Sequence, residues 1–125
     1  MATAPAPPNY DDTLIQYIVV RRDLKNYGTG ALIAQGSHAA AAALHVSRDA
    51  PTTQAYLADL DAMHTVVLEG GSAEALREAA EGLEKAGVQH KVWVERPEMV
   101  VTALASAPNR RALLKPLFAA FKLLR

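Results

Sequence analysis

The sequence LIQYIVVR at residues 14–21 is almost continuously apolar and rich in β-branched residues. A run of this kind is typical of a strand that is buried on both faces and parallel to at least one neighbour. The connection that follows, residues 23–30, contains Gly28 and Gly30, and residues 31–47 form an alanine-rich helical pattern. A buried strand, a glycine-containing loop and a helix in this order predict an α/β fold.

The rest of the chain continues this alternation. We predict helices at residues 51–63, 73–86 and 109–117, strands at 64–69, 90–95 and 99–105, and a short edge strand at 121–124. Ser72 is a suitable N-cap for the middle helix, and Gly87 would end it. Residues 64–95 predict a right-handed βαβ unit with parallel strands. The expected architecture is a single three-layer α/β domain, in which helices cover both faces of a mixed sheet of about four strands.

Length and composition restrict the function classes. The chain has 125 residues, which fits one domain at residues 14–125, preceded by a proline-rich, disordered arm at residues 1–13. The lack of cysteine excludes a disulfide scaffold, a Cys-ligated zinc site and a thiol nucleophile. No apolar run approaches the ~20 residues that span a bilayer, and the first residues are no secretory signal. We therefore expect a cytoplasmic protein with no membrane partner.

Charge is balanced overall but unevenly distributed. The 13 basic and 13 acidic residues argue against a dedicated, high-affinity nucleic-acid binder. Residues 109–125 nevertheless carry basic side chains, among them Arg110 and Arg111, and no acidic ones, and a second basic group includes Arg22 and Lys25. These groups are either solvated helix faces or two basic edges that meet on one surface and attract phosphate.

Polar residues on the alanine-rich helix follow a pattern. Gln35, His38 and His45 lie at positions i, i+3 and i+10, which places them along one stripe that faces solvent, a cleft or a partner. His38 is either a histidine bonded to a backbone carbonyl or a base that contacts a substrate. Gln35 would then orient His38 or bind a substrate amide.

The loop before this helix could hold an anion. Gly28 and Gly30 let a ligand approach the backbone, the helix N-terminus offers free N–H groups, and Arg22 and Lys25 add positive charge. Ligands of parallel sheets sit at the carboxyl ends of the strands, where this loop begins. A loop without any ligand fits these residues equally well. No set of side chains has the spacing of a metal site, and a Gly-x-Ser-x-Gly nucleophile motif is absent.

The run IVVRRDLK at residues 18–25, continued by GTG, AQ and HAA up to residue 40, resembles the opening signature of the type 2 peptidyl-tRNA hydrolases. The likeness is greatest to their divergent branch, the peptidyl-tRNA hydrolase domain-containing protein 1 group. It extends through WVERPE at residues 93–98 and FKLL at residues 121–124, and covers nearly the whole chain after Thr13. The resemblance implies hydrolysis of the ester between a peptide and the terminal ribose of tRNA, with no cofactor, and a homodimer.

The chain departs from the family pattern at several positions. The family lysine that directly follows Gly-x-Gly is Ala31 here, and Lys25 or Arg96 is a candidate replacement. The family's Asp-Ala-Gly loop and its following threonine are replaced by ERPE at residues 95–98, so that Glu95 or Glu98 would stand in for the aspartate. Thr102 matches an active-site threonine of the family. The expected catalytic residues are Thr102, His38 and Glu95, and the expected substrate-binding residues are Arg22, Lys25, Gly28, Gly30 and Gln35.

Three functions remain open at this point. The first is a peptidyl-tRNA hydrolase with an altered site, acting on peptidyl-tRNA or another RNA. The second is a catalytically impaired relative that binds RNA or a protein, which the missing lysine favours. The third is a small-ligand regulatory domain, which would need an apolar pocket and would show no salt-sensitive RNA binding.

Overall fold

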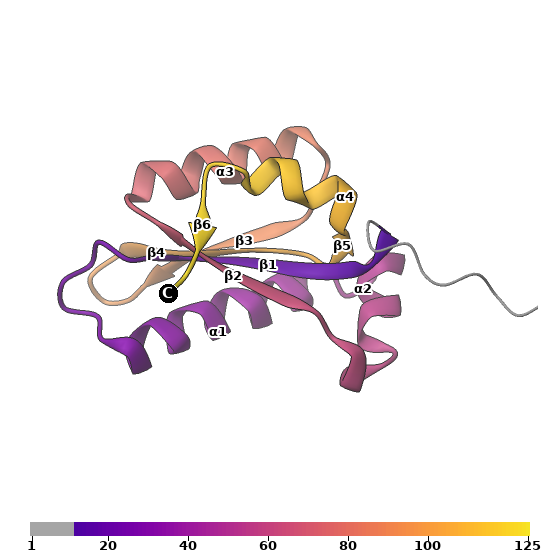
Figure 1. The fold of residues 1–125 in the computed structure, drawn as a ribbon. Helices are drawn as coiled ribbons and strands as arrows, with labels where there is room; N and C mark the ends of the chain where they lie inside the picture. The colour runs from indigo at the N-terminus through magenta and orange to yellow at the C-terminus, as the bar shows by residue number, and fades with distance from the viewer. Residues whose placement is uncertain (1–11) are drawn as a thin grey trace, which may run out of the picture.

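A six-stranded mixed sheet forms the middle layer of the domain (Figure 1). The computed structural model describes residues 12–125. The predicted arm at residues 1–13 therefore lies outside the described residues, except for Asp12 and Thr13. The strands are β1 (Leu14–Arg21), β2 (Thr65–Gly70), β3 (His90–Glu95), β4 (Val100–Ser106), β5 (Asn109–Arg110) and β6 (Lys122–Leu123). Their order is β3-β4-β1-β2-β6, and β5 pairs with β1.

The central position of β1 follows from its sequence. Residues 15–20 are all buried, because β2 and β4 pair with the two edges of the strand and helices cover both of its faces. β1 is parallel to β2 and antiparallel to β4, which in turn is antiparallel to β3. The predicted strand–helix–strand unit at residues 64–95 therefore has parallel strands, but β1 and β4 lie between them in the sheet.

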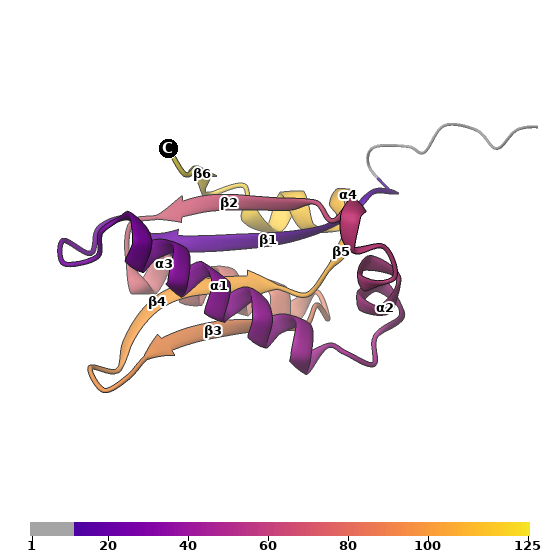
Figure 2. The same ribbon diagram turned by 90° about the horizontal axis from the view of Figure 1, so that it is seen from below.

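Helices complete the three predicted layers (Figures 1 and 2). One face of the sheet carries α1 (Thr29–Val46), and the other carries α3 (Ala73–Lys85), α4 (Arg111–Leu114) and the 3₁₀ helix η3 (Lys115–Phe118). Ser72 caps α3 by accepting a hydrogen bond from the Ala75 amide, and Gly87 follows the helix with a φ of 72°. The larger core fills the α3 side, where Tyr17 stacks on Phe118 with ring centroids 4.8 Å apart.

The core on the α1 side is built from small residues. Ala39 and Ala43 of the helix face Ala103 and Ala105 of β4, and all four are fully buried. A methyl group on Gly36 would lie only 3.3 Å from Val20 Cγ1. The helix axis therefore runs close to the sheet, which lets side chains of α1 reach polar groups on β3 and β4.

Two predicted helices are shorter than expected. The helix predicted at residues 51–63 ends as α2 (Pro51–Leu57) and is followed by the 3₁₀ turn η2 (Leu60–Ala62). The backbone at Asp59 is extended, and the Asp59 carboxylate accepts a hydrogen bond from the Asp61 amide. This local hydrogen bond competes with continuation of the helix. The helix predicted at 109–117 begins at Arg111, because the two residues before it pair with β1, and Pro116 favours a tighter 3₁₀ turn.

Within residues 12–125, no helix combines the length and the apolar character that crossing a membrane requires.

Candidate active site

Three polar side chains from three elements are joined by two hydrogen bonds. The hydroxyl of Thr102 on β4 donates to Gln35 Oε1 over 2.6 Å, and Gln35 Nε2 on α1 donates to Glu95 Oε2 over 2.5 Å. Thr102 is 0% exposed and Gln35 is 4% exposed, whereas Glu95 is half-buried at the end of β3. This Thr102–Gln35–Glu95 relay leads from the core of the domain to a carboxylate at its surface.

The relay lies where the fold brings several chain ends together. β1, β2 and β3 run in the same direction, so their carboxyl ends share one end of the sheet with the start of α1 and the turn between β3 and β4 (Figure 2). The sequence pattern indicated this same end of the sheet. Close packing of α1 on the alanines of β4 brings Gln35 within reach of both partners.

The charge of Glu95 fixes the orientation of the Gln35 amide. The Gln35 hydrogen bond lowers the pKa of Glu95, partial burial opposes this shift, and the Trp93 indole N–H, the positive charge of His38 and the Arg96 amide add to the lowering. An ionised carboxylate only accepts hydrogen bonds, so the Gln35 NH₂ group must point to it and the Gln35 oxygen to Thr102. The Thr102 proton is consequently committed to Gln35.

His38 lies beside the relay without joining it. Its ring stacks on Trp93 of β3, with centroids 4.8 Å apart and planes 22° apart. His38 and His45 are exposed on α1, as the predicted stripe requires, but Gln35 turns inward and is buried. The predicted stripe is therefore found for His38 and His45 only, and Gln35 lies outside it on the buried side of α1.

Two aromatic residues near the site were not predicted as site residues. Trp93 buries its Nε1–H, which forms no hydrogen bond of ordinary geometry within residues 12–125 but lies close enough to Glu95 to lower the pKa of that carboxyl. Burial raises the pKa of Tyr27, and the nearby carboxylates of Glu98 and Glu95 raise it further. Neither residue falls in a spacing pattern of the kind that identifies catalytic groups, so nothing in the single sequence pointed to them.

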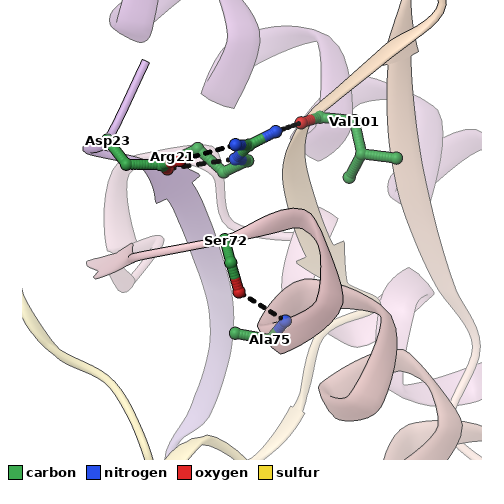
Figure 3. A network of polar contacts seen from close by, with 5 residues as sticks. All are labelled: Arg21, Asp23, Ser72, Ala75 and Val101. Carbon is green, nitrogen blue, oxygen red and sulfur yellow. Dashed lines mark hydrogen bonds and ion pairs between the residues drawn. The ribbon is translucent and has the colours of Figure 1, made fainter. Parts of the chain in front are cut away.

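An ion pair anchors the loop between β1 and α1 (Figure 3). Arg21 donates to both carboxylate oxygens of Asp23, over 3.0 and 2.5 Å, and its Nη1 donates to the Val101 carbonyl over 3.0 Å. The hydrogen bonds from Arg21 lower the pKa of Asp23. The charge of Arg21 is thus neutralised, and the loop is tied to the β4 residue next to Thr102.

The expected substrate-binding residues surround this anchored loop. Gly28 is the N-cap of α1 and Gly30 lies in its first turn; a methyl group at either position would contact nothing within 4 Å. Arg22 and Lys25 are exposed and form no ion pair with another residue of the described chain. The fold itself therefore requires neither glycine, and both cations are available to a ligand.

The two basic regions meet only in part, because Arg22 and Lys122 line the same cavity but Arg110 lies far from both. Arg110 pairs with Leu14 at the start of β1, whereas Arg22 follows the end of this eight-residue strand, roughly 25 Å away. Lys122, in β6, returns to the end of the sheet where Arg22 lies, and it pairs with Glu69 at 3.3 Å. Arg110 therefore lies on a surface separate from the loop, whereas Lys122 and Arg22 line one cavity.

A groove of about 470 Å³ follows β3 beside the relay, and its lining includes Lys91, Trp93, Glu95, Arg96 and Met99. A larger cavity of about 660 Å³ lies between the end of β2, the start of α3 and the C-terminal tail, and no relay residue lines it. Residues 12–125 contain no group of three His, Cys, Asp or Glu side chains that could hold a metal ion.

Known proteins are similar to this chain over most of its length. Residues 14–124 match the family model described as peptidyl-tRNA hydrolase PTH2. A human protein named "Putative peptidyl-tRNA hydrolase PTRHD1" is 44% identical over 112 residues, which cover 86% of this chain and 78% of the relative. The mouse protein of the same name is 46% identical over 99 residues, which cover 76% of this chain and 71% of the relative.

Proposed function

We propose that this chain, which belongs to the PTH2 family of peptidyl-tRNA hydrolases, hydrolyses the ester between a peptide and the 3′ ribose of tRNA. The observation that carries the proposal is the Thr102–Gln35–Glu95 relay, which presents an oriented carboxylate at the edge of a groove. In the reaction, a water oxygen attacks the ester carbonyl and the bond from that carbon to the ribose oxygen breaks. The ribose oxygen takes up the proton that the base removed from water, so that a free peptide acid and an intact tRNA 3′ end result.

Glu95 is the proposed base. Its Oε2 is held by Gln35, and its side chain is half-buried at the groove, so the carboxylate can accept a proton from the attacking water. Thr102 and Gln35 are positioning residues in this scheme, because both are buried and act through the carboxylate. His38 is the second candidate base, since its ring lies near enough to Glu95 to affect the pKa of that carboxyl.

The cation of the site must come from a position other than residue 31. Ala31 replaces the family lysine, so charge that develops on the carbonyl oxygen and on phosphate needs another partner. Arg96 directly follows Glu95, and Lys25 lies in the loop before α1; both are exposed and unpaired within the described chain. We assign Lys25 and Arg22 to tRNA phosphates and Arg96 to the reacting ester. Gly28 and Gly30 would admit the substrate to the start of α1.

The test is hydrolysis of N-acetyl-aminoacyl-tRNA by purified wild-type protein and by Glu95→Gln. This substitution keeps the side-chain size and still offers an oxygen to Gln35, but it removes the base. We expect the rate to fall by about 10²- to 10⁴-fold. Glu98→Gln is the matched control, because Glu98 lies in the same turn and no hydrogen bond joins it to the relay in the described chain. An equal loss in Glu98→Gln would overturn the assignment to Glu95.

A folded wild-type protein without turnover would support the second function, a family member that binds RNA or a protein. Binding of tRNA that weakens steeply with salt would then identify RNA as the partner, because contacts with phosphate depend strongly on salt. Its absence would favour a protein partner. The homodimer expected from the resemblance is part of this proposal, and light scattering on the purified chain measures it.

A further inference from the structure

The stacked rings of His38 and Trp93 form a flat aromatic surface beside the relay. Trp93 lies two residues before Glu95 on β3, and His38 lies one helical turn after Gln35 on α1. The His38 ring stacks on Trp93 with centroids 4.8 Å apart, and His38 is exposed, so the ring face turned away from Trp93 is the one that can meet solvent. The proposed chemistry uses the nitrogen atoms of His38 and leaves this ring face without a role.

Two free cations lie in the groove that Trp93 lines. Lys91 and Arg96 are exposed members of its lining, and neither forms an ion pair with another residue from 12 to 125. An aromatic plane flanked by cations matches a nucleotide, whose base stacks on rings and whose phosphates attract lysine and arginine. Unpaired RNA ends are recognised in this way, because their bases are free to stack.

We propose that the open face of His38, supported from behind by Trp93, stacks the unpaired 3′-terminal base of tRNA. Lys91 contacts the phosphates of the last nucleotides, and Arg96, assigned above to the ester, lies in the same groove. The assignment rests on the proposed function and names a subsite of its substrate. The ester is carried by the terminal ribose, so the terminal base lies within one nucleotide of the reacting carbonyl. A base platform must therefore adjoin the proposed base, as His38 and Trp93 adjoin Glu95.

Trp93 makes this subsite directly observable, because it is the only tryptophan of the chain. The probe is the trinucleotide 5′-CCA-3′ with a 5′ fluorescein, and the comparison probe has the same backbone with an abasic 3′ residue. Unlabelled CCA should change the Trp93 emission of the wild-type protein, and the abasic probe should bind about tenfold more weakly by fluorescence anisotropy.

Three variants separate stacking from other roles of the histidine. His38→Ala should weaken CCA binding by about tenfold, and His38→Phe should restore it, since a phenyl ring offers the same flat face without nitrogen atoms. His45→Ala is the control on the same helix and should bind as the wild type does. Circular dichroism and thermal melting verify that each variant is folded.

The proposed platform would be overturned if the two probes bound equally well. It would also be overturned if His38→Ala bound CCA as tightly as the wild type does. Failure of His38→Phe to restore binding would overturn it as well. Hydrolysis of N-acetyl-aminoacyl-tRNA is measured in parallel. Base-dependent binding without hydrolysis supports the platform and removes the proposed function. Hydrolysis with base-independent binding keeps the function and removes the platform.

Discussion

The hydroxyl of Thr102 donates its hydrogen bond to Gln35 Oε1 over 2.6 Å, and both side chains are buried. The Gln35 oxygen has no solvent to replace this donor, so the bond decides how the amide is turned. The other end of the same amide holds Glu95. A residue in the core thereby controls a carboxylate at the surface, although the two side chains share no hydrogen bond.

Thr102→Val should disable the relay while preserving its shape. Valine has nearly the volume of threonine but no donor, so the Gln35 oxygen is left buried and unpaired at a cost of about 1–3 kcal/mol. We expect slower ester hydrolysis together with lower stability in urea. Thr102→Ser retains the hydroxyl and should recover most of the rate. A serine variant as slow as the valine variant would show that the hydroxyl does not act through Gln35.

The pKa of Glu95 should depend on Gln35. The hydrogen bond lowers the pKa below the ordinary value of 4.5, so its stabilising effect is present above pH 4.5 and is lost as the pH falls through the folded-state pKa. Gln35→Met removes the donor without shrinking the side chain, and the Glu95 midpoint should rise. ¹³C NMR titration of the carboxyl carbon in both proteins measures this. Identical midpoints would contradict the relay.

Gly70→Ala should destabilise the fold at the end of β2. The added methyl group would lie 2.6 Å from Leu76 Cδ1 and 3.2 Å from Val19 Cγ1, and both of these residues are fully buried. Relieving such overlap in a packed core costs about 1–3 kcal/mol. Gly71→Ala is the adjacent control, because its methyl group contacts nothing within 4 Å. The free energies of unfolding of the two variants, measured in urea, should differ by this cost of about 1–3 kcal/mol.

Alanine at Gly28 or Gly30 should separate stability from function. Neither position needs glycine for the fold, and Gly30→Ala in the first turn of α1 should stabilise the protein by up to about 1 kcal/mol. If the substrate approaches this backbone as proposed, hydrolysis falls although stability does not. Gly82→Ala in α3, also without a neighbour within 4 Å, should leave the rate unchanged. An unchanged rate in all three variants would remove the two glycines from the site.

The long elements of the fold could be predicted because local patterns determine them. The apolar run at 14–21 had to be a buried strand, and Ser72 and Gly87 mark the ends of α3 through capping and a left-handed turn. The separation of β2 from β3 by two strands was not predictable, since sheet order depends on contacts between distant residues. The 3₁₀ segments were missed because side-chain hydrogen bonds and Pro116 compete with helix propagation.

The relay shows a similar limit for the site. Gln35, Glu95 and Thr102 were each singled out, but the spacing of Gln35 suggested a stripe shared with His38 and His45. Their actual connection depends on how closely α1 approaches β3 and β4, which the alanines of both elements permit. The stacking of His38 on Trp93 depends on the same approach, and no periodicity in either segment indicates it.

The position of each cation in the fold predicts its effect on tRNA binding. Arg22 and Lys25 lie in the loop before α1, at the end of the sheet where the relay lies, whereas Arg110 lies at the opposite end of β1, paired with Asp12 at 3.6 Å. Each cation that contacts a phosphate adds about one unit to the slope of log affinity against log salt concentration. Arg22→Ala and Lys25→Ala should therefore reduce this slope by about one each, as measured by anisotropy of labelled tRNA.

Arg110→Ala serves as the control for these two variants, since it removes the same charge from a distant surface. Its slope should equal that of the wild type, although affinity at low salt can fall slightly through the change in net charge. A slope reduced equally by all three substitutions would mean that tRNA covers both ends of β1. The phosphates would then follow the length of the sheet, and the groove along β3 would hold only the end of a longer contact.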